Sequence, residues 1–289
     1  MNQGSRIVVI AIVVLAAVGG VLWWRKHQVK PAPKAPVSTV APAPPPAPPA
    51  PPPPAPKPAI SHPIAAAPET GKLPPLDQAD TFVRDRLIEL VGRKGALAFL
   101  GIDSFVRHFV ATVANLGADH APADMWPVKR TEGAFEADTR GDATVISPKN
   151  AERYGLFVAF VDGIDAAKAV ALYRRLYPLF QEAYEELGYP GKYFNDRAIE
   201  VIDDLLATPD VGEPIKLKRV EVPGADPAAS AKGKPRGGLY VFDDPEMERR
   251  TAGQKILLRM GHTHATRLKA KLVAVRALIA SGPSAPRAR

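Results

Sequence analysis

Hydrophobic residues recur at helical spacing through most of residues 73–281. After Asp165, for example, Ala169, Leu176, Phe180 and Leu187 fall on one stripe, which predicts a long helix kinked at Pro178 and stopped by Gly188. Residues that typically cap helices precede several such stripes. The predicted helix starts are Asp80, Asp103-Ser104, Ser147-Pro148, Asp165, Asn195 and Asp244-Pro245. A last pair of helices is predicted to meet near Gly261.

Strand patterns are few. Ile215 to Val222 alternates apolar with charged residues, and Gly238 to Phe242 is predicted to pair with it. Phe135 to Ile146, interrupted by Gly141-Asp142, predicts a second short hairpin. The segment from Pro223 to Gly237, rich in Gly, Ala and Pro, is predicted to be a mobile loop. The predicted fold class is therefore mainly α, a helical globular domain with a minor β-hairpin.

An unbroken apolar run from Ile7 to Trp24 lies between Arg6 and Arg25. Eighteen residues at helical rise are just long enough to cross a bilayer, and the run has no polar face. A cleaved signal peptide would require small residues in an A-x-A-like pattern after the run, whereas Val21, Leu22 and two tryptophans follow Gly19-Gly20. The run is predicted to be an uncleaved transmembrane anchor.

Between Pro31 and Pro58, 15 of 28 residues are proline. Consecutive prolines adopt extended polyproline II and form no packed core, which indicates a disordered stalk. The predicted organisation is a short tail at 1–6, an anchor at 7–24, a Pro/Ala-rich stalk at 25–72, a helical soluble domain at 73–281 and a disordered tail at 282–289.

Charge is distributed unevenly. The net formal charge is +6 over residues 1–72, −8 over 73–248 and +10 over 249–289. Basic residues after the apolar run favour a cytoplasmic domain by the positive-inside rule. A long rigid spacer instead resembles those that carry domains away from the inner membrane of bacteria. We place the chain in the bacterial inner membrane as a single-pass protein with a periplasmic domain, while the flanking charges favour the opposite side.

The C-terminal helix is basic, and its apolar stripe is Leu268, Leu272, Val275 and Ile279. We expect this helix to dock on the acidic body of the domain. The alternative is contact with phosphate on anionic lipid or nucleic acid, but the stripe lacks the bulky aromatic residues typical of lipid-binding helices. Nucleic acid is not expected as a partner.

Aromatic residues concentrate between positions 173 and 194. Tyr173, Tyr177, Tyr184, Tyr189 and Tyr193 are the candidate ligand-binding residues, because rings presented beside a glycine-containing turn stack on sugars or clasp a peptide. The alternative is that these rings belong to the core, as aromatic residues at helical spacing usually do. Both interpretations remain open on sequence alone.

Candidate chemistry is otherwise sparse. Glu182, beside Glu185 and Glu186, is a weak candidate for the general acid of a sugar-cleaving enzyme. The chain has no cysteine, which excludes disulfides and thiolate sites. His262 and His264 diverge on a helix and have no third ligand nearby in sequence. No metal site and no cofactor are predicted.

Three segments resemble a bacterial family catalogued as a domain of unknown function, number 3014. They are LPPLDQADTFVR (73–84), ALYRRLYPLFQEAYEELGYPGKYFNDRAIEVIDDLLATP (171–209) and YVFDDPEMERRTAGQKILLRMG (240–261). The resemblance implies a membrane-tethered protein of Gram-negative bacteria, and since the family has no established activity it lends no catalytic residues.

The function that these expectations favour is a non-enzymatic binding or scaffolding domain for the cell wall or another envelope protein. Two alternatives stay open. One is a cell-wall hydrolase that uses a helix carboxylate such as Glu182. The other is a cytoplasmic adaptor that binds nucleic acid or anionic lipid through its basic C-terminal helix.

Overall fold

The computed structural model describes residues 59–64, 72–221 and 238–280. The predicted tail at 1–6, anchor at 7–24, most of the stalk, the loop 223–237 and the tail 282–289 lie outside these residues. Within the part that is described, no helix is both long and apolar enough to span a membrane. The elements are the 3-10 helices η1 (Leu76–Gln78) and η2 (Ala123–Met125), the strands β1 (Ala137–Arg140), β2 (Ala143–Ile146), β3 (Lys216–Glu221) and β4 (Gly238–Phe242), and the α-helices α2 (Asp80–Phe99), α3 (Phe105–Leu116), α4 (Lys149–Gly163), α5 (Ala166–Glu186), α6 (Phe194–Leu206), α7 (Pro245–Glu248), α8 (Ala252–Met260) and α9 (His262–Ala280).

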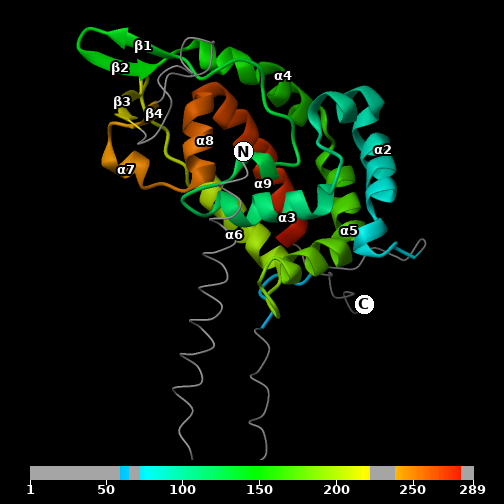
Figure 1. The fold of residues 1–289 in the computed structure, drawn as a ribbon. Coiled ribbons are helices and arrows are strands. Elements are labelled where there is room, and N and C mark those ends of the chain that lie inside the picture. The colour runs from blue at the N-terminus through cyan, green and yellow to red at the C-terminus, as the bar shows by residue number, and fades with distance from the viewer. Residues whose placement is uncertain (1–58, 65–71, 222–237, 281–289) are drawn as a thin grey trace, which may run out of the picture. The chain divides into compact units, whose positions relative to one another are not determined.

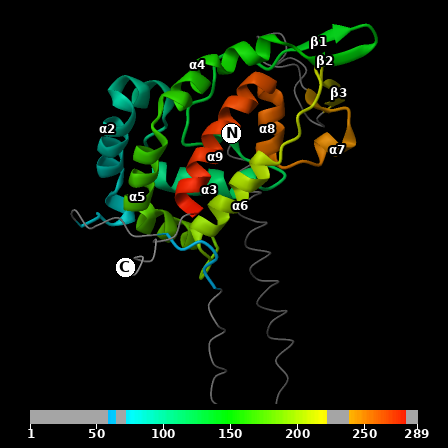
Figure 2. The ribbon, with the colours of Figure 1, turned by 180° about the vertical axis from the view of Figure 1, so that it is seen from behind.

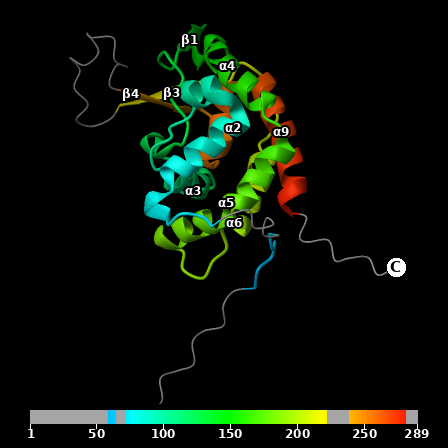
Figure 3. The ribbon, with the colours of Figure 1, turned by 90° about the vertical axis from the view of Figure 1, so that its right-hand side faces the viewer.

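The described chain is mainly helical, as predicted, and its strands gather on one side. Figure 1 shows the sheet and α7 on the side opposite α2, with α3, α8 and α9 between them, and Figure 2 shows the same order from behind. In Figure 3, α9 runs along α5, and these two helices are in contact. Because α9 also contacts α4, α6 and α8, the last helix of the described chain holds the helical layer together.

The two predicted hairpins, β1–β2 and β3–β4, both occur and are joined into one sheet. Its four strands lie in the order β1-β2-β3-β4, and every neighbouring pair is antiparallel. The hairpins are joined through β2 and β3, where Thr144 lies opposite Leu217. Leu217 and Phe242 are buried against α8, so the sheet contributes a core cluster of its own.

The largest core cluster lies between α2, α3, α5 and the start of α6. The predicted stripe of α5 supplies Leu176 and Phe180, which are buried, and Phe180 packs near the fully buried Phe194 with ring centroids 5.9 Å apart. Pro178 lies inside α5, as predicted. Leu187 is an exception to the prediction, because α5 ends at Glu186 and leaves this side chain 42% exposed.

Local capping patterns predict some helix starts and fail at others. The carboxylates of Asp165 and Asp244 accept hydrogen bonds from the amides of Lys168 and Glu246, which confirms both as N-caps. Two predicted caps are wrong. Asp80 lies inside α2 and accepts instead from the amide of Ser104, while Asn195 lies inside α6, whose N-cap residue is Tyr193. In both cases a distant partner uses the polar side chain. A third predicted cap, Ser147, is also wrong, because Pro148 is the N-cap residue of α4 and the Ser147 hydroxyl makes no capping hydrogen bond. Ser104 is the N-cap residue of α3, as predicted, but its side chain makes no capping hydrogen bond.

The basic helix α9 docks on the body of the domain, which confirms that prediction. Its stripe packs in two further core clusters. Leu268 and Leu272 pack on the cluster that contains Val201 and Leu257. Leu272, Val275 and Ile279 pack in the cluster that contains Ile199 and Ile202. Its cations reach carboxylates and carbonyls of neighbouring helices. Arg267 pairs with Asp162, Arg276 pairs with Asp203, and Lys271 Nζ donates to the carbonyl oxygen of Ile164 over 2.7 Å.

Candidate functional site

The five candidate tyrosines divide into core residues and groove residues. Tyr184 is 3% exposed and stacks on Tyr189, with ring centroids 4.6 Å apart. Tyr173 packs beside Phe180 in the same core cluster. Tyr189 and Tyr193 are half-buried and lie in the turn that links α5 to α6. The core interpretation therefore holds for Tyr173 and Tyr184, while Tyr184, Tyr189 and Tyr193 also line a surface groove.

Tyr177 and Gln181 hold the α5–α6 turn in place. The Tyr177 hydroxyl donates to Gln181 Oε1 over 3.1 Å, and the same oxygen accepts the backbone amide of Phe194 over 2.9 Å. Gln181 Nε2 in turn donates to the carbonyl oxygen of Lys192 over 2.7 Å. Burial raises the pKa of the Tyr177 phenol above its ordinary value, so this hydroxyl stays protonated as a donor. Tyr177 thus positions the groove without lining it.

Asn195 is fully buried at the start of α6, and its amide group bridges three segments. The hydroxyl of Tyr173 donates to Asn195 Oδ1 over 3.1 Å. Asn195 Nδ2 donates to the carbonyl oxygen of His62 over 2.8 Å and more weakly to that of Ile279 over 3.4 Å. A buried amide needs such partners because an unsatisfied polar group in the core is costly. Desolvation raises the pKa of Tyr173, which keeps its hydroxyl a donor to Asn195.

Asp196, the next residue, binds the backbone N–H groups of the same segment. Its Oδ2 accepts the backbone amide of Ser61 over 3.0 Å, and its Oδ1 accepts that of His62 over 2.7 Å. Asp196 lies in the first turn of α6, where the positive end of the helix dipole favours a carboxylate. We call Asn195 and Asp196 the backbone clamp, because together they bind two N–H groups and one C=O group of consecutive residues.

The clamp lies at the edge of a groove of about 680 Å³. The groove is lined by rings and by charges of both signs. Lys192 lies over the ring of Tyr189, 5.6 Å from its centroid, and Arg197 pairs with Glu200 at 2.9 Å. The lining residues are Ala59, Ser61, His62, Tyr184, Tyr189, Lys192, Tyr193, Asp196, Arg197, Ile199, Glu200 and Asp203. Residues 59–64, within the range predicted as stalk, therefore lie against the folded domain.

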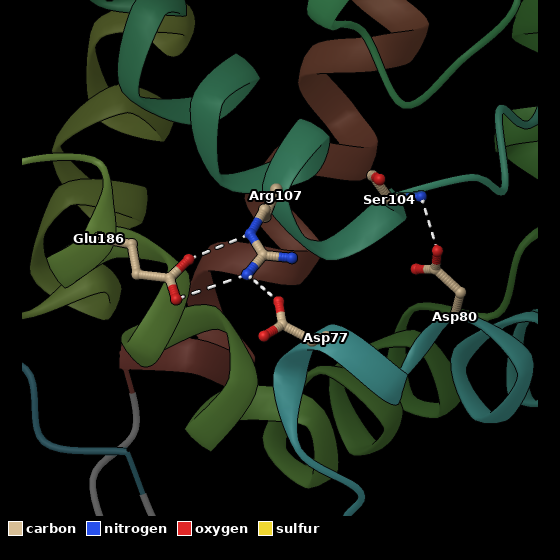
Figure 4. Close-up of polar contacts among 5 residues, drawn as sticks. All are labelled: Asp77, Asp80, Ser104, Arg107 and Glu186. Atoms are coloured by element: carbon tan, nitrogen blue, oxygen red, sulfur yellow. Dashed lines mark hydrogen bonds and ion pairs between the residues drawn. The ribbon is translucent and has the colours of Figure 1, made fainter.

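Several carboxylates close to Glu182 in the sequence or on α6 bind side chains of other elements. Glu182 itself is exposed on α5. Glu186 binds Arg107 from α3, with Nε to Oε2 at 3.0 Å, and Arg107 also binds Asp77 from η1 at 2.7 Å (Figure 4). The hydrogen bond from Arg276 holds the pKa of Asp203 below its usual range. The Thr251 hydroxyl donates to Asp204 over 2.7 Å.

The two clustered histidines point to different partners. His262 Nδ1 lies 2.7 Å from a carboxylate oxygen of Asp210, and His264 Nε2 lies 2.8 Å from the carbonyl oxygen of Ala151. Within the described ranges, no group of three or more His, Cys, Asp or Glu side chains is placed to hold a metal ion.

Sequence reasoning found the rings of the groove but missed the clamp. The sequence predicts Asn195 to be a helix cap, and Asp196 is one of several carboxylates near the rings, with no sign that it binds backbone. The partners of the clamp lie more than 130 positions away in the chain, at Ser61 and His62. No local pattern marks such a pairing, and the one available signal is the amide-carboxylate pair Asn195-Asp196 beside a dense aromatic stretch.

Comparison with known proteins gives one family. A family model described as "Protein of unknown function (DUF3014)" matches residues 105–276. This range includes α3 to most of α9, and therefore the clamp and the ring-bearing turn. No curated protein and no solved structure matches the chain.

Proposed function

The chain belongs to the family described as protein of unknown function DUF3014, and we propose that its folded domain is a non-enzymatic module that binds an extended polypeptide segment in the groove beside α6. The observation that carries this proposal is the backbone clamp. Asp196 accepts two successive backbone amides, and Asn195 donates to the carbonyl of the second residue. Main-chain hydrogen bonds of this kind supply affinity for an extended peptide, while adjoining side-chain contacts supply selectivity.

Binding explains the groove better than hydrolysis does. A glycoside hydrolase requires two facing carboxyl groups, one of them with a raised pKa. Asp196 instead binds backbone amides, and Asp203 has a lowered pKa beside Arg276. Glu182, the candidate acid from the sequence, is exposed on α5 and does not line this groove.

The segment in the clamp supports a proposal for the chemistry of the partner. Residues 59–64 include Pro63 and follow directly on the proline-rich stretch. Proline restricts the backbone to extended conformations, so such a segment loses little conformational entropy on binding. We infer that the partner presents an extended, proline-containing segment. We place the module at the bacterial envelope, held by the predicted anchor at 7–24, with another envelope protein as the partner.

The chain's own segment and a partner would compete for the clamp. A tethered segment has a high effective concentration, so it lowers the apparent affinity for the same sequence added in solution. A Gly-Ser sequence in place of residues 59–64 keeps the backbone groups but removes the side-chain contacts of this segment and the conformational restriction of Pro63. It should therefore bind the clamp more weakly and leave it available to a partner. The test is fluorescence anisotropy of a labelled peptide with the sequence of residues 57–66, added to the full chain in lipid nanodiscs.

We expect the Gly-Ser chain to bind this peptide more tightly than the wild type does. In the Gly-Ser chain, Asp196→Asn should abolish binding, because an amide nitrogen replaces one acceptor oxygen. Glu182→Gln is the matched control: it removes the same charge from an exposed residue of α5 that does not line the groove. Equal binding by the Asp196→Asn chain, or no binding by the Gly-Ser chain, would overturn the proposal. Asp196-dependent sedimentation with purified cell wall in place of peptide binding would do the same.

A further inference from the structure

A cavity of about 350 Å³, partly open to solvent, is lined by residues of α2, α3, α5, α6 and α9, whose arrangement Figures 1 and 3 show. Its lining includes residues of three core clusters: Leu176 of the largest cluster, Val201 of the cluster that contains Leu257, and Ile202 of the cluster that contains Ile199. Of the lining residues, Tyr173 alone carries a polar side-chain atom, and that hydroxyl is bonded to Asn195. The cavity wall therefore offers no free hydrogen-bonding side chain.

The lining is apolar although the cavity is partly open to solvent. Water molecules against its wall find no free hydrogen-bonding side chain. Contact between water and this apolar surface is unfavourable, and an apolar occupant would remove that cost. The volume falls within the range of about 300–1,000 Å³ that is usual for ligand pockets.

We propose that this cavity is a binding site for one aliphatic chain, such as the acyl chain of a lipid. Aliphatic side chains from α6 and α9, among them Ile202 and Val275, form one wall. The rings of Phe105, Phe109 and Phe180 form another, and they pack on one another with centroids 5.0 to 6.0 Å apart. A slender, flexible chain without hydrogen-bonding atoms matches this lining, and a polar head group has no partner inside it.

The cavity is separate from the backbone clamp, although Tyr173 and the start of α6 border both. An occupant would contact α5, α6 and α9 together, and these helices also position the clamp. Filling of the cavity is therefore expected to stabilise the clamp without touching the peptide.

Photolabelling with site mapping tests this proposal in the full chain. The chain is placed in lipid nanodiscs, either with a diazirine-bearing fatty acid added or with a diazirine-bearing phospholipid in the bilayer, and cross-linked residues are identified by mass spectrometry. Labels on lining residues such as Ile202 and Leu272 are expected from at least one probe. The probe that gives these labels shows whether the occupant is a free fatty acid or a bilayer lipid. Labels from both probes confined to residues outside the cavity would overturn the proposal.

A cavity-filling variant provides the specific control. Ala169→Phe places a ring in the cavity and should abolish labelling of Ile202, while Ala171→Phe adds the same ring at an exposed position of α5 and should leave it unchanged. Ala198→Leu is a smaller filling change, which keeps the test available if Ala169→Phe fails to fold. Unchanged labelling of Ile202 in a folded filling variant would also overturn the assignment of this cavity as the site.

Discussion

The hydroxyl of Tyr173 donates a hydrogen bond to Asn195 Oδ1 over 3.1 Å, which leaves the NH2 of Asn195 facing the carbonyl oxygen of His62. A core ring on α5 thereby fixes the orientation of the amide that binds residues 59–64. The proposed binding function depends on this relay, because an Asn side chain rotated by half a turn would present oxygen to oxygen.

Tyr173→Phe should therefore weaken the clamp while leaving the fold intact. The change removes one hydrogen bond to a buried amide, which is worth about 1 kcal/mol. We expect the affinity of the Gly-Ser chain for the labelled peptide to fall about fivefold, as measured by anisotropy. Tyr154→Phe is the comparison, since it removes a hydroxyl from α4, away from the clamp. An equal loss in both variants would show that Tyr173 acts only through general packing.

The two glycines Gly253 and Gly155 should respond oppositely to alanine. A Cβ at Gly253 would lie 2.5 Å from Leu205 and 3.1 Å from the carbonyl oxygen of Leu116, where α8 crosses α6 and α3. Gly253→Ala should therefore destabilise the chain by about 1–3 kcal/mol. At Gly155, inside α4, a Cβ meets nothing within 4 Å, so Gly155→Ala should stabilise by about 0.5–1 kcal/mol. Thermal unfolding measures both, and shifts of the same sign would contradict the packing described for α8.

Acid should loosen the docking of α9. The hydrogen bond from Arg276 lowers the pKa of Asp203 below its unfolded value, so the pair stabilises the folded state above that value. The stabilisation is lost as pH falls from about 3.9, the ordinary pKa of an aspartate, through the lower pKa of the folded chain. Hydrogen exchange of α9 should rise over that window in the wild type. In Asp203→Asn, exchange should already be raised at neutral pH and should lack this component.

The ion pairs of Arg107 should contribute little to stability. Arg107 binds Glu186 and Asp77, but its side chain is 39% exposed and those of its partners are 48% and 84% exposed. Exposed pairs are worth about 0.2–1 kcal/mol and are screened by salt. Glu186→Gln should lower the free energy of unfolding by less than about 1 kcal/mol, and the difference should shrink in high salt. A larger, salt-independent loss would mean that Arg107 holds the end of α5 in another way.

Local patterns in the sequence predict most helices and strands. The partners of individual polar side chains depend instead on contacts between residues far apart in the chain. Asp165 and Asp244 cap helices as predicted, because each bonds an amide within three residues. The same kind of residue at Asp80 and Asn195 misled the prediction, since Ser104 and Tyr173 bind those side chains from other elements. Capping propensity describes what a side chain does when nothing else competes for it.

The aromatic part of the candidate site was predictable from the sequence, and its backbone-binding part was not. A dense run of rings marked Tyr184, Tyr189 and Tyr193, and these residues do line one groove. The polar groups that bind backbone were not predictable, because Asp196 and Ser61 are 135 positions apart and only the fold brings them together. The cavity among five helices likewise follows from how the stripes pack and not from any one stripe.

Hydrogen exchange at the backbone amides of Ser61 and His62 in the full chain tests the backbone clamp most directly. Slow exchange is expected at both amides, because Asp196 accepts their hydrogen bonds. Exchange should be fast in Asp196→Asn and should be unchanged in Glu182→Gln, a change at an exposed residue outside the groove. Fast exchange of both amides in the wild-type chain would contradict the clamp, and with it the proposal that this domain holds an extended polypeptide.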